Sequence, residues 1–157
     1  MPDVVISLQG QRETLNKLNS LAQLQALKPF VRAAGLHVKS KVAEYPPSSE
    51  ANAPGPYPAK WYERGYGPKW ALKGGGIHGR KTSQTLGRRW SIEMRDAGLT
   101  AAIVNHVAYG PYVQDRTTQR WFHKARGWKT IQDAVEECEK LITTWLLVAV
   151  NRIVATK

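Results

Sequence analysis

The sequence contains a single cysteine, Cys138, and no long apolar run. One cysteine excludes a framework of disulfide bonds within the chain, and we expect Cys138 to be a small buried side chain on a helix. The longest apolar run, Trp145–Val150, is far shorter than the roughly 20 residues that a membrane-spanning helix needs. The N-terminus also lacks a basic stretch followed by an apolar one. We therefore expect a soluble protein that is not exported through a signal peptide.

Acidic residues are scarce. The chain of 157 residues has 23 Lys and Arg against 12 Asp and Glu, which gives a net charge of +11. The excess is uneven, because residues 57–95 hold nine basic and two acidic residues and residues 116–129 hold five basic residues and no acid. Clustered positive charge favours a polyanion or an acidic protein face over a small neutral ligand.

The residue patterns of catalysis are missing as well. His78, His106 and His123 lie in different loops, and none pairs with another His or Cys at the spacing of metal ligands. No Gly-x-Ser-x-Gly motif marks a nucleophile, and carboxylates are sparse in the basic loops, where a metal-dependent nuclease would need them. We therefore predict a protein that is not an enzyme, with no catalytic residues, no metal and no cofactor.

The apolar content of 42% suits a folded chain, and we expect residues 1–157 to form a single α+β domain around a β-hairpin. Apolar and polar residues alternate over Trp90–Arg95 and over Leu99–Ile103, and Asp96–Gly98 connects the two runs with a glycine suited to a turn. One face of this antiparallel sheet should be covered by two N-terminal helices and a long C-terminal helix. The side chains predicted on that face are Trp90, Ile92, Met94, Leu99, Ala101 and Ile103.

Two helices are predicted before the hairpin. Apolar residues at helical spacing indicate one helix over Gln11–Ala26 and another over Pro29–Tyr45, where Pro29 suits a first turn. Gly35 is a weak point of the second helix, and we expect His37 to be solvated or half-buried. Val4–Leu8 is a candidate for a short edge strand.

After the hairpin, the spacing of Tyr109–Val113 predicts one helical turn that presses its aromatic rings against the sheet. Thr130 and Asp133 then form a capping-box pattern, which predicts a final helix over Ile131–Val154. The apolar stripe of this helix is Ile131, Ala134, Val135, Cys138, Leu141, Ile142, Trp145, Leu146, Ala149 and Ile153.

Residues 46–81 are rich in proline and glycine, so we expect no regular element of any length there. The segment also carries large aromatic residues, which are unusual in flexible linkers and indicate an extended arm that docks on another molecule. Gly74–Gly76 lacks the Gly-Lys-Ser/Thr ending of a phosphate-binding loop, so nucleotide binding is not expected. Residues 115–129 form a second basic and aromatic loop.

Aromatic and basic side chains of this kind suit two classes of partner, protein surfaces and nucleic acids. The side chains predicted to contact a neighbouring subunit or partner are Tyr57, Trp61, Tyr62, Tyr66, Trp70, Arg116, Arg120, Trp121, Phe122, Lys124, Arg126 and Trp128. Those predicted to face DNA are Lys69, Lys73, Arg80, Lys81, Arg88 and Arg89.

The order of several motifs resembles a known family. A helix ending in Tyr45-Pro46-Pro47 is followed by TSQTLGRRW (Thr82–Trp90), the hairpin, and NHVAYGPYVQD (Asn105–Asp115). This succession, which extends from about Phe30 to about Val135, resembles the putative tail-component family of long-tailed bacteriophages, whose members complete the tail or join it to the head. FHKARGWKT (Phe122–Thr130) is similar to a loop in a prophage branch of the same family.

The resemblance implies a non-enzymatic structural virion protein, a tail-completion or head-tail joining (neck) subunit that is assembled in the host cytoplasm. It implies a homo-oligomeric ring, with six copies as the expected number, at the head-proximal end of the tail. Its partners would be tail-tube and connector proteins, with double-stranded DNA in the channel and no membrane. The alternative is a non-catalytic nucleic-acid-binding module that uses the basic loops as a phosphate track.

Overall fold

The computed structural model describes residues 4–6, 21–55, 60–63, 67–79 and 85–155. The chain is α+β, with small antiparallel sheets and a long C-terminal helix, as predicted. It divides into two compact units, each built from separate segments. We call residues 42–90 and 105–133 the small-sheet unit, and the described parts of 3–41, 91–104 and 134–157 the helical unit. The single domain over residues 1–157 stays a prediction.

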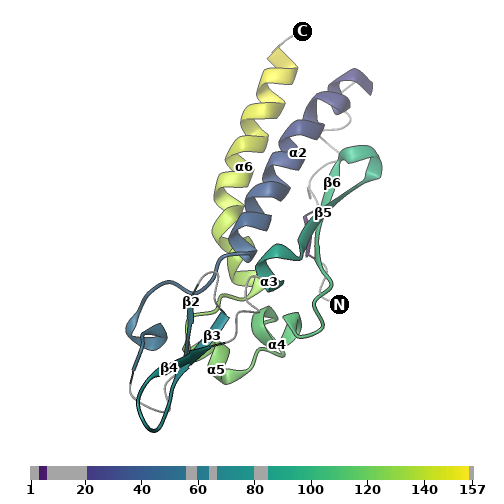
Figure 1. Ribbon diagram of the computed structural model, residues 1–157. Coiled ribbons are helices and arrows are strands. Elements are labelled where there is room, and N and C mark those ends of the chain that lie inside the picture. Colours follow the sequence, from purple (N-terminus) through teal and green to yellow (C-terminus); the bar gives the residue numbers. More distant parts are fainter. Residues whose placement is uncertain (1–3, 7–20, 56–59, 64–66, 80–84, 156–157) are drawn as a thin grey trace. The chain divides into compact units, whose positions relative to one another are not determined.

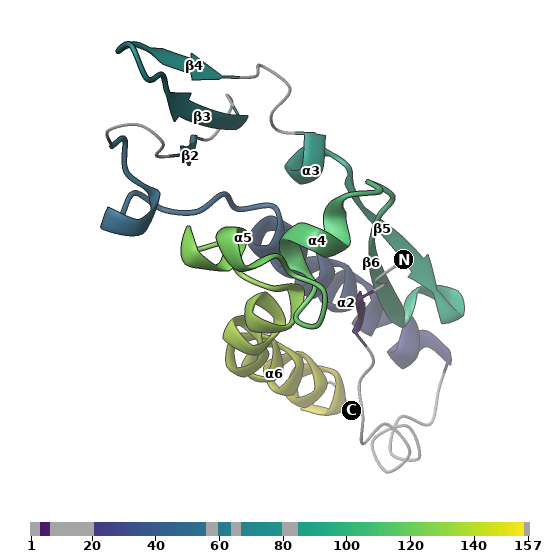
Figure 2. The same cartoon turned by 90° about the horizontal axis from the view of Figure 1, so that it is seen from below.

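The helical unit contains two long helices, α2 (Leu21–Val42) and α6 (Ile131–Ala155), which lie side by side in Figures 1 and 2. Its sheet has the strand order β1-β6-β5, from β1 (Val4–Ile6), β6 (Thr100–Asn105) and β5 (Trp90–Arg95). The hairpin and the edge strand are thus confirmed. Its buried apolar side chains include Leu27, Val31, Ala34, Val38, Cys138, Ile142, Leu146 and Ala149.

The chain approaches itself closely where α2 meets β6. A Cβ atom placed on Gly35 of α2 would lie 2.8 Å from the Cβ of Ala101. Glycine is therefore required at this position for contact with the strand, which explains a residue that looked like a weak point of the helix. The neighbouring His37 is half-buried, as predicted, with its ring 5.3 Å from that of Trp145.

The predicted break between two N-terminal helices is wrong. Helix α2 continues through Pro29, although an interior proline lacks the N–H for one helical hydrogen bond. Leu24 and Leu27 before Pro29 and Phe30 after it pack in one apolar cluster with Ala149 of α6. Packing on both sides of the proline holds the helix together. Residues 11–20 of the first predicted helix lie outside the described residues.

Three burial predictions in the sheet and α6 also need correction. Strand β6 is buried at every residue from Thr100 to Asn105, so both of its faces are covered and the predicted alternation of buried and exposed side chains does not apply to it. Met94, near the end of β5, is exposed. Leu141 is exposed as well, although Cys138 and Ile142 on the same stripe are buried.

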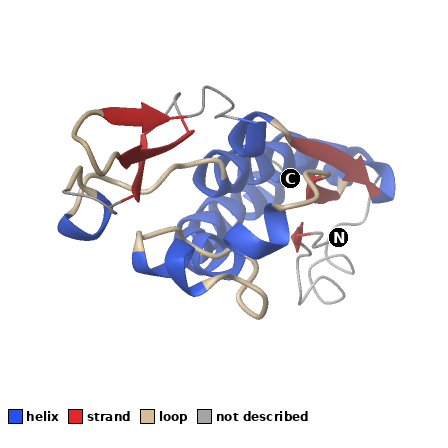
Figure 3. Ribbon diagram, turned by 60° about the horizontal axis from the view of Figure 1, so that its bottom comes forward, coloured by secondary structure: helices blue, strands red, loops and turns tan. Residues whose placement is uncertain are grey.

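The small-sheet unit overturns the prediction that residues 46–81 hold no regular element. A short 3-10 helix (Glu50–Asn52) precedes three antiparallel strands, β2 (Lys60–Glu63), β3 (Gly67–Ala71) and β4 (Ile77–Gly79), in the order β2-β3-β4 (Figure 3). The strands are short, and only β3 contains a proline. Pro68 pairs only with β2, at Tyr62, so its missing N–H interrupts no pairing with β4.

The glycine triplet forms the turn between β3 and β4. Leu72 N–H donates to Gly76 O at 3.1 Å, and Gly75 N–H donates to Leu72 O at 3.1 Å. Gly75 and Gly76 have φ angles of 87° and 93°, a region that side chains rarely adopt. The glycine triplet is therefore explained by the backbone conformation of this turn.

Three short helices complete this unit: α3 (Thr85–Arg88), α4 (Gly110–Gln114) and α5 (Trp121–Ala125). The predicted turn at Tyr109–Val113 is present as α4, but the prediction that its aromatic rings press against the sheet is wrong. Val113 is buried, while Tyr109 and Tyr112 are exposed. The core consists of Leu86, Val113 and Trp128, with Tyr45, Tyr62 and Val107 against it.

The predicted capping box starts α6. Asp133 N–H donates to the Thr130 hydroxyl at 3.1 Å, and Thr130 N–H donates to the Asp133 carboxylate at 3.0 Å. The helix ends one residue beyond the predicted end. Among the described residues, no helix has the length and apolar character to cross a membrane.

Candidate interaction surface

The two loops that we predicted to reach outwards pack on each other within the small-sheet unit. The Tyr62 hydroxyl of β2 lies 3.1 Å from Nδ1 of His123 in α5, and the Tyr62 ring lies 5.4 Å from that of Trp128. Arg126 Nε donates to Lys60 O at 2.6 Å. Strand β2 and the segment around α5 therefore form one body.

A buried asparagine fastens the start of the first loop to the same strand. Asn52 Oδ1 accepts from Tyr62 N–H at 2.7 Å, and Asn52 Nδ2 donates to Tyr62 O at 3.1 Å. The side-chain amide thus pairs with the backbone of β2 as another strand would. Asn52 Nδ2 also lies within 3.4 Å of Pro46 O and 3.3 Å of Pro47 O.

This packing corrects part of the predicted contact set. Trp61 and Trp128 are buried, with 2% and 7% of their surfaces exposed, so neither side chain is a surface anchor. Tyr62, Trp70 and Arg126 are half-buried. The predicted contact residues Tyr57 and Tyr66 lie outside the described residues.

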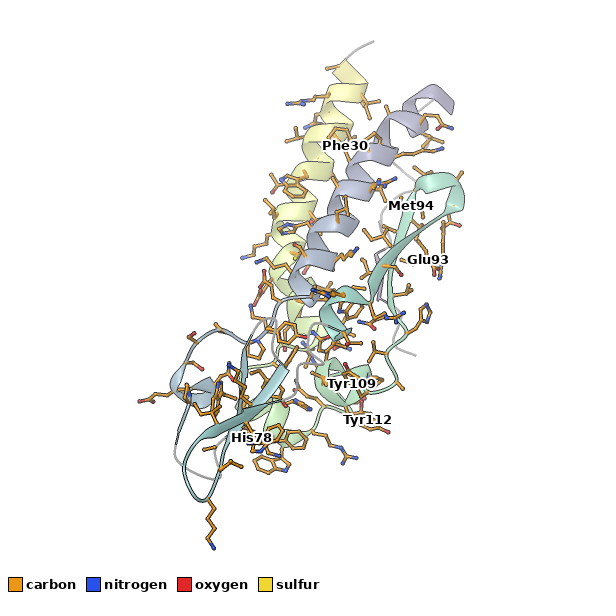
Figure 4. All side chains as sticks on the ribbon, viewed as in Figure 1. Phe30, His78, Glu93, Met94, Tyr109 and Tyr112 are labelled. Carbon is orange, nitrogen blue, oxygen red and sulfur yellow. The ribbon has the colours of Figure 1, made fainter. Side chains whose placement is uncertain are left out.

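The rest of the predicted set lies at the surface, around α4 and α5. Trp121 has 77% of its surface exposed, beside exposed Phe122 and Lys124. Tyr109, directly before α4, and Tyr112 of α4 are also exposed; both are labelled in Figure 4. We define the α4–α5 surface as Tyr109, Tyr112, Arg120, Trp121, Phe122 and Lys124.

Direct contacts make this surface continuous. The Arg120 guanidinium lies 5.2 Å from the centre of the Tyr112 ring, a cation–π distance, and Arg120 N–H donates to Tyr112 O at 2.9 Å. The Trp121 and Phe122 rings meet edge to face at 5.9 Å. Gln119 Nε2 donates to Val113 O and Trp128 O, which ties the connecting loop to the core. The aromatic groups are therefore presented on a fixed support.

The charge on the surface comes from arginine and lysine, not from histidine. Burial, with Arg126 nearby, lowers the pKa of His123 from 6.5 to about 4, so its ring is neutral at pH 7. Arg116 pairs with Asp133 at 2.9 Å, and the hydrogen bonds from Thr130 are the main reason that the pKa of Asp133 is lowered. Arg120 and Lys124 supply the positive charge beside the rings.

The residues predicted to face DNA are only partly placed. Lys73, Arg88 and Arg89 are exposed, Lys69 is half-buried, and Arg80 and Lys81 lie outside the described residues. In the part of the chain that the structure describes, no three His, Cys, Asp or Glu side chains are arranged to hold a metal ion.

Our sequence reasoning missed the side-chain amides that hold these loops. Asn52 and Gln119 do not belong to a helical or alternating pattern of apolar residues, so the sequence pattern does not identify them. Asn105 and Gln114 do lie inside the motif Asn105–Asp115. Asn105 Nδ2 donates to Leu86 O at 2.8 Å, and Gln114 Nε2 donates to Val42 O at 2.7 Å.

No family model, curated protein or solved structure matches the chain. The resemblance to phage tail-component proteins rests on the quoted motifs.

Proposed function

We propose that the chain is a structural virion protein of a long-tailed bacteriophage, a tail-completion or head-tail joining subunit. It assembles as a ring, and the α4–α5 surface is its contact with neighbouring subunits or adjoining virion proteins. The order of the quoted motifs, which resembles the tail-component family, supports this proposal.

The α4–α5 surface is the observation that carries the proposal. Tyr, Trp and Arg are the residue types that contribute most to binding between proteins, and here they are adjacent, exposed and held in place. Exposing a tryptophan as fully as Trp121 costs free energy that a partner recovers by covering it. The buried positions of Trp61 and Trp128 concentrate the proposed contact on this one surface.

The motif residues have a physical role in building the surface. Val113 and Gln114 of the motif are buried and anchor α4, which leaves Tyr112 exposed and in contact with Arg120. The motif therefore places an aromatic contact residue at a defined position, as an assembly surface requires.

Electron microscopy tests the proposal. The full chain is imaged alone and mixed with the purified connector and tail-tube proteins of the phage or prophage that encodes it. We expect rings for the wild type and for Lys73→Ser, an exposed basic control outside the surface, and no rings for Trp121→Ser. Single copies or pairs in every mixture would overturn the proposal.

A second candidate function is a nucleic-acid-binding module, which exposed Arg88, Arg89 and Lys73 favour. If it is correct, log affinity for double-stranded DNA falls with log salt concentration by about 0.9 for each phosphate neutralised. Substituting both Arg88 and Arg89 with Ser should then reduce the slope by up to about 2. Binding that does not change with salt rules this function out.

A further inference from the structure

Helix α6 has an uncharged outward face. No charged residue occurs between Lys140 and Arg152. On one side of this stretch Ile142 and Ala149 are buried, whereas Leu141, Leu147 and Val148 are exposed, with 59% of the Leu147 surface accessible. The solvent side of a surface helix is ordinarily polar or charged, so a second apolar face indicates a partner.

The exposed residues form a regular stripe. Leu141, Thr144, the pair Leu147 and Val148, Asn151 and Val154 recur at intervals of three or four residues, which places them on one side of the helix. The Thr144 hydroxyl donates to Lys140 O at 2.9 Å, so its polar group is satisfied within the helix. We call these six residues the α6 stripe.

We propose that the α6 stripe binds the α6 stripe of a second copy of the chain, with the two helices antiparallel. The stripe is self-complementary about Leu147 and Val148. A two-fold axis at that point places Leu141 opposite Val154 of the other copy and Thr144 opposite Asn151. Apolar side chains then face apolar ones, and the two polar residues face each other.

Charge favours the antiparallel orientation. Glu136, Glu137 and Glu139 are exposed in the first turns of α6, while exposed Arg152 lies near its other end. An antiparallel pair places the acidic end of each helix beside the basic end of the other. A parallel pair would place the glutamates of both copies together, which is unfavourable.

The size of the contact predicts its strength. One stripe on one helix buries less than the roughly 800 Å² per partner of a typical stable interface, so the pair should be reversible. A two-fold contact closes at two copies, whereas a ring needs a head-to-tail contact. The α6 pair is therefore distinct from the ring contact of the α4–α5 surface, and it does not depend on the phage assignment.

Sedimentation equilibrium of the full chain tests the pair. Leu147→Lys places a charge at the centre of the contact, while Leu36→Lys on α2, where the leucine is 48% exposed, is the matched control. Every protein in this test also carries Trp121→Ser, so that the proposed ring contact is absent. We expect a dimer for Trp121→Ser alone and with the control substitution, and at least about tenfold weaker association when Leu147→Lys is added. A monomeric Trp121→Ser protein, or a dimer that Leu147→Lys leaves intact, overturns the proposal. Equal loss in both variants overturns it too.

Cysteine crosslinking tests the orientation. Native Cys138 is buried, so an added cysteine is the accessible one. Under oxidation, Leu141→Cys should not crosslink to itself but should crosslink to the Val154→Cys variant when the two proteins are mixed. Self-crosslinking of Leu141→Cys as the main product would show a parallel pair and contradict the proposed register.

Discussion

Trp121 and Trp128, at the two ends of the α5 segment, show how one residue type takes two roles. Trp128 belongs to the core of the small-sheet unit with Leu86 and Val113, and its ring contacts that of Tyr45 at 5.0 Å. Trp121 has most of its surface exposed. Composition and spacing place both in one aromatic, basic loop, so the sequence does not distinguish the core residue from the exposed one.

The two tryptophans should therefore respond differently to truncation. Trp128→Ala removes a core side chain and should lower the free energy of unfolding by about 3–5 kcal/mol. Trp121→Ala should change it by less than about 0.5 kcal/mol, because surface substitutions away from special features have small effects. Urea unfolding followed by circular dichroism measures both, and losses of similar size would contradict the assigned burial.

His123 should make stability depend on pH. Its pKa is 6.5 in the unfolded chain and about 4 in the folded one, chiefly because the ring is buried. Between these values the unfolded state binds a proton that the folded state does not. The contribution of neutral, buried His123 to the free energy of unfolding should therefore be full above pH 6.5. It should decrease as the pH falls from 6.5 to 4 and change no further below pH 4.

Urea unfolding at a series of pH values measures this dependence. His123→Gln should flatten the profile between pH 6.5 and 4. A titration of the His123 ring by NMR with a midpoint near 6.5 would contradict the burial that we describe.

At the scale of elements, the contact between α2 and β6 decides the effect of a glycine substitution. Glycine to alanine inside a helix ordinarily stabilises by about 1 kcal/mol. At Gly35 the added Cβ would lie 2.8 Å from Ala101 Cβ, which is attached to a buried central strand and cannot rotate away. Overpacking costs about 1–3 kcal/mol, so we expect Gly35→Ala to be net destabilising.

Urea unfolding checks the sign. Ala33→Gly, at an exposed position of the same helix, is the control and should cost about 1 kcal/mol through helix propensity alone. If Gly35→Ala raised stability by a similar amount, α2 and β6 could not be in close contact at this point.

Elements specified by local sequence could be predicted. The hairpin, the capping box of Thr130 and Asp133, and the length of α6 depend on residues close together in the chain. The missed features depend on distant partners. Strand β6 is buried at every residue, and α2, distant in the chain, packs against it at Ala101. Helix α2 continues through Pro29 because residues on both sides of the proline pack against α6.

The exposure of the predicted contact residues follows from the sequence only in part. Aromatic and basic residues mark the two segments, and of these residues Arg120, Trp121, Phe122 and Lys124 are exposed whereas Trp61 and Trp128 are buried. No periodic pattern in the sequence indicates the pairing of β2 with β3. The same holds for the hydrogen bonds from Asn52 that fasten residues 46–52 to β2. The pairing and these hydrogen bonds convert a predicted open arm into a folded unit, which buries Trp61.

For the whole molecule, we assign different tasks to the two units. The small-sheet unit presents the α4–α5 surface, which we propose as the ring contact, and the helical unit presents the α6 stripe, which we propose as a two-fold contact. Because the residues of the two surfaces do not overlap, single substitutions should separate the two kinds of association.

Native mass spectrometry of the full chain, alone and mixed with connector and tail-tube proteins, tests the central claim most directly. We predict closed rings for the wild type and for Leu147→Lys, and none for Trp121→Ser, which should keep the two-fold pair. Species no larger than a dimer in every mixture, or rings that Trp121→Ser leaves unchanged, would contradict the claim that the α4–α5 surface assembles this protein.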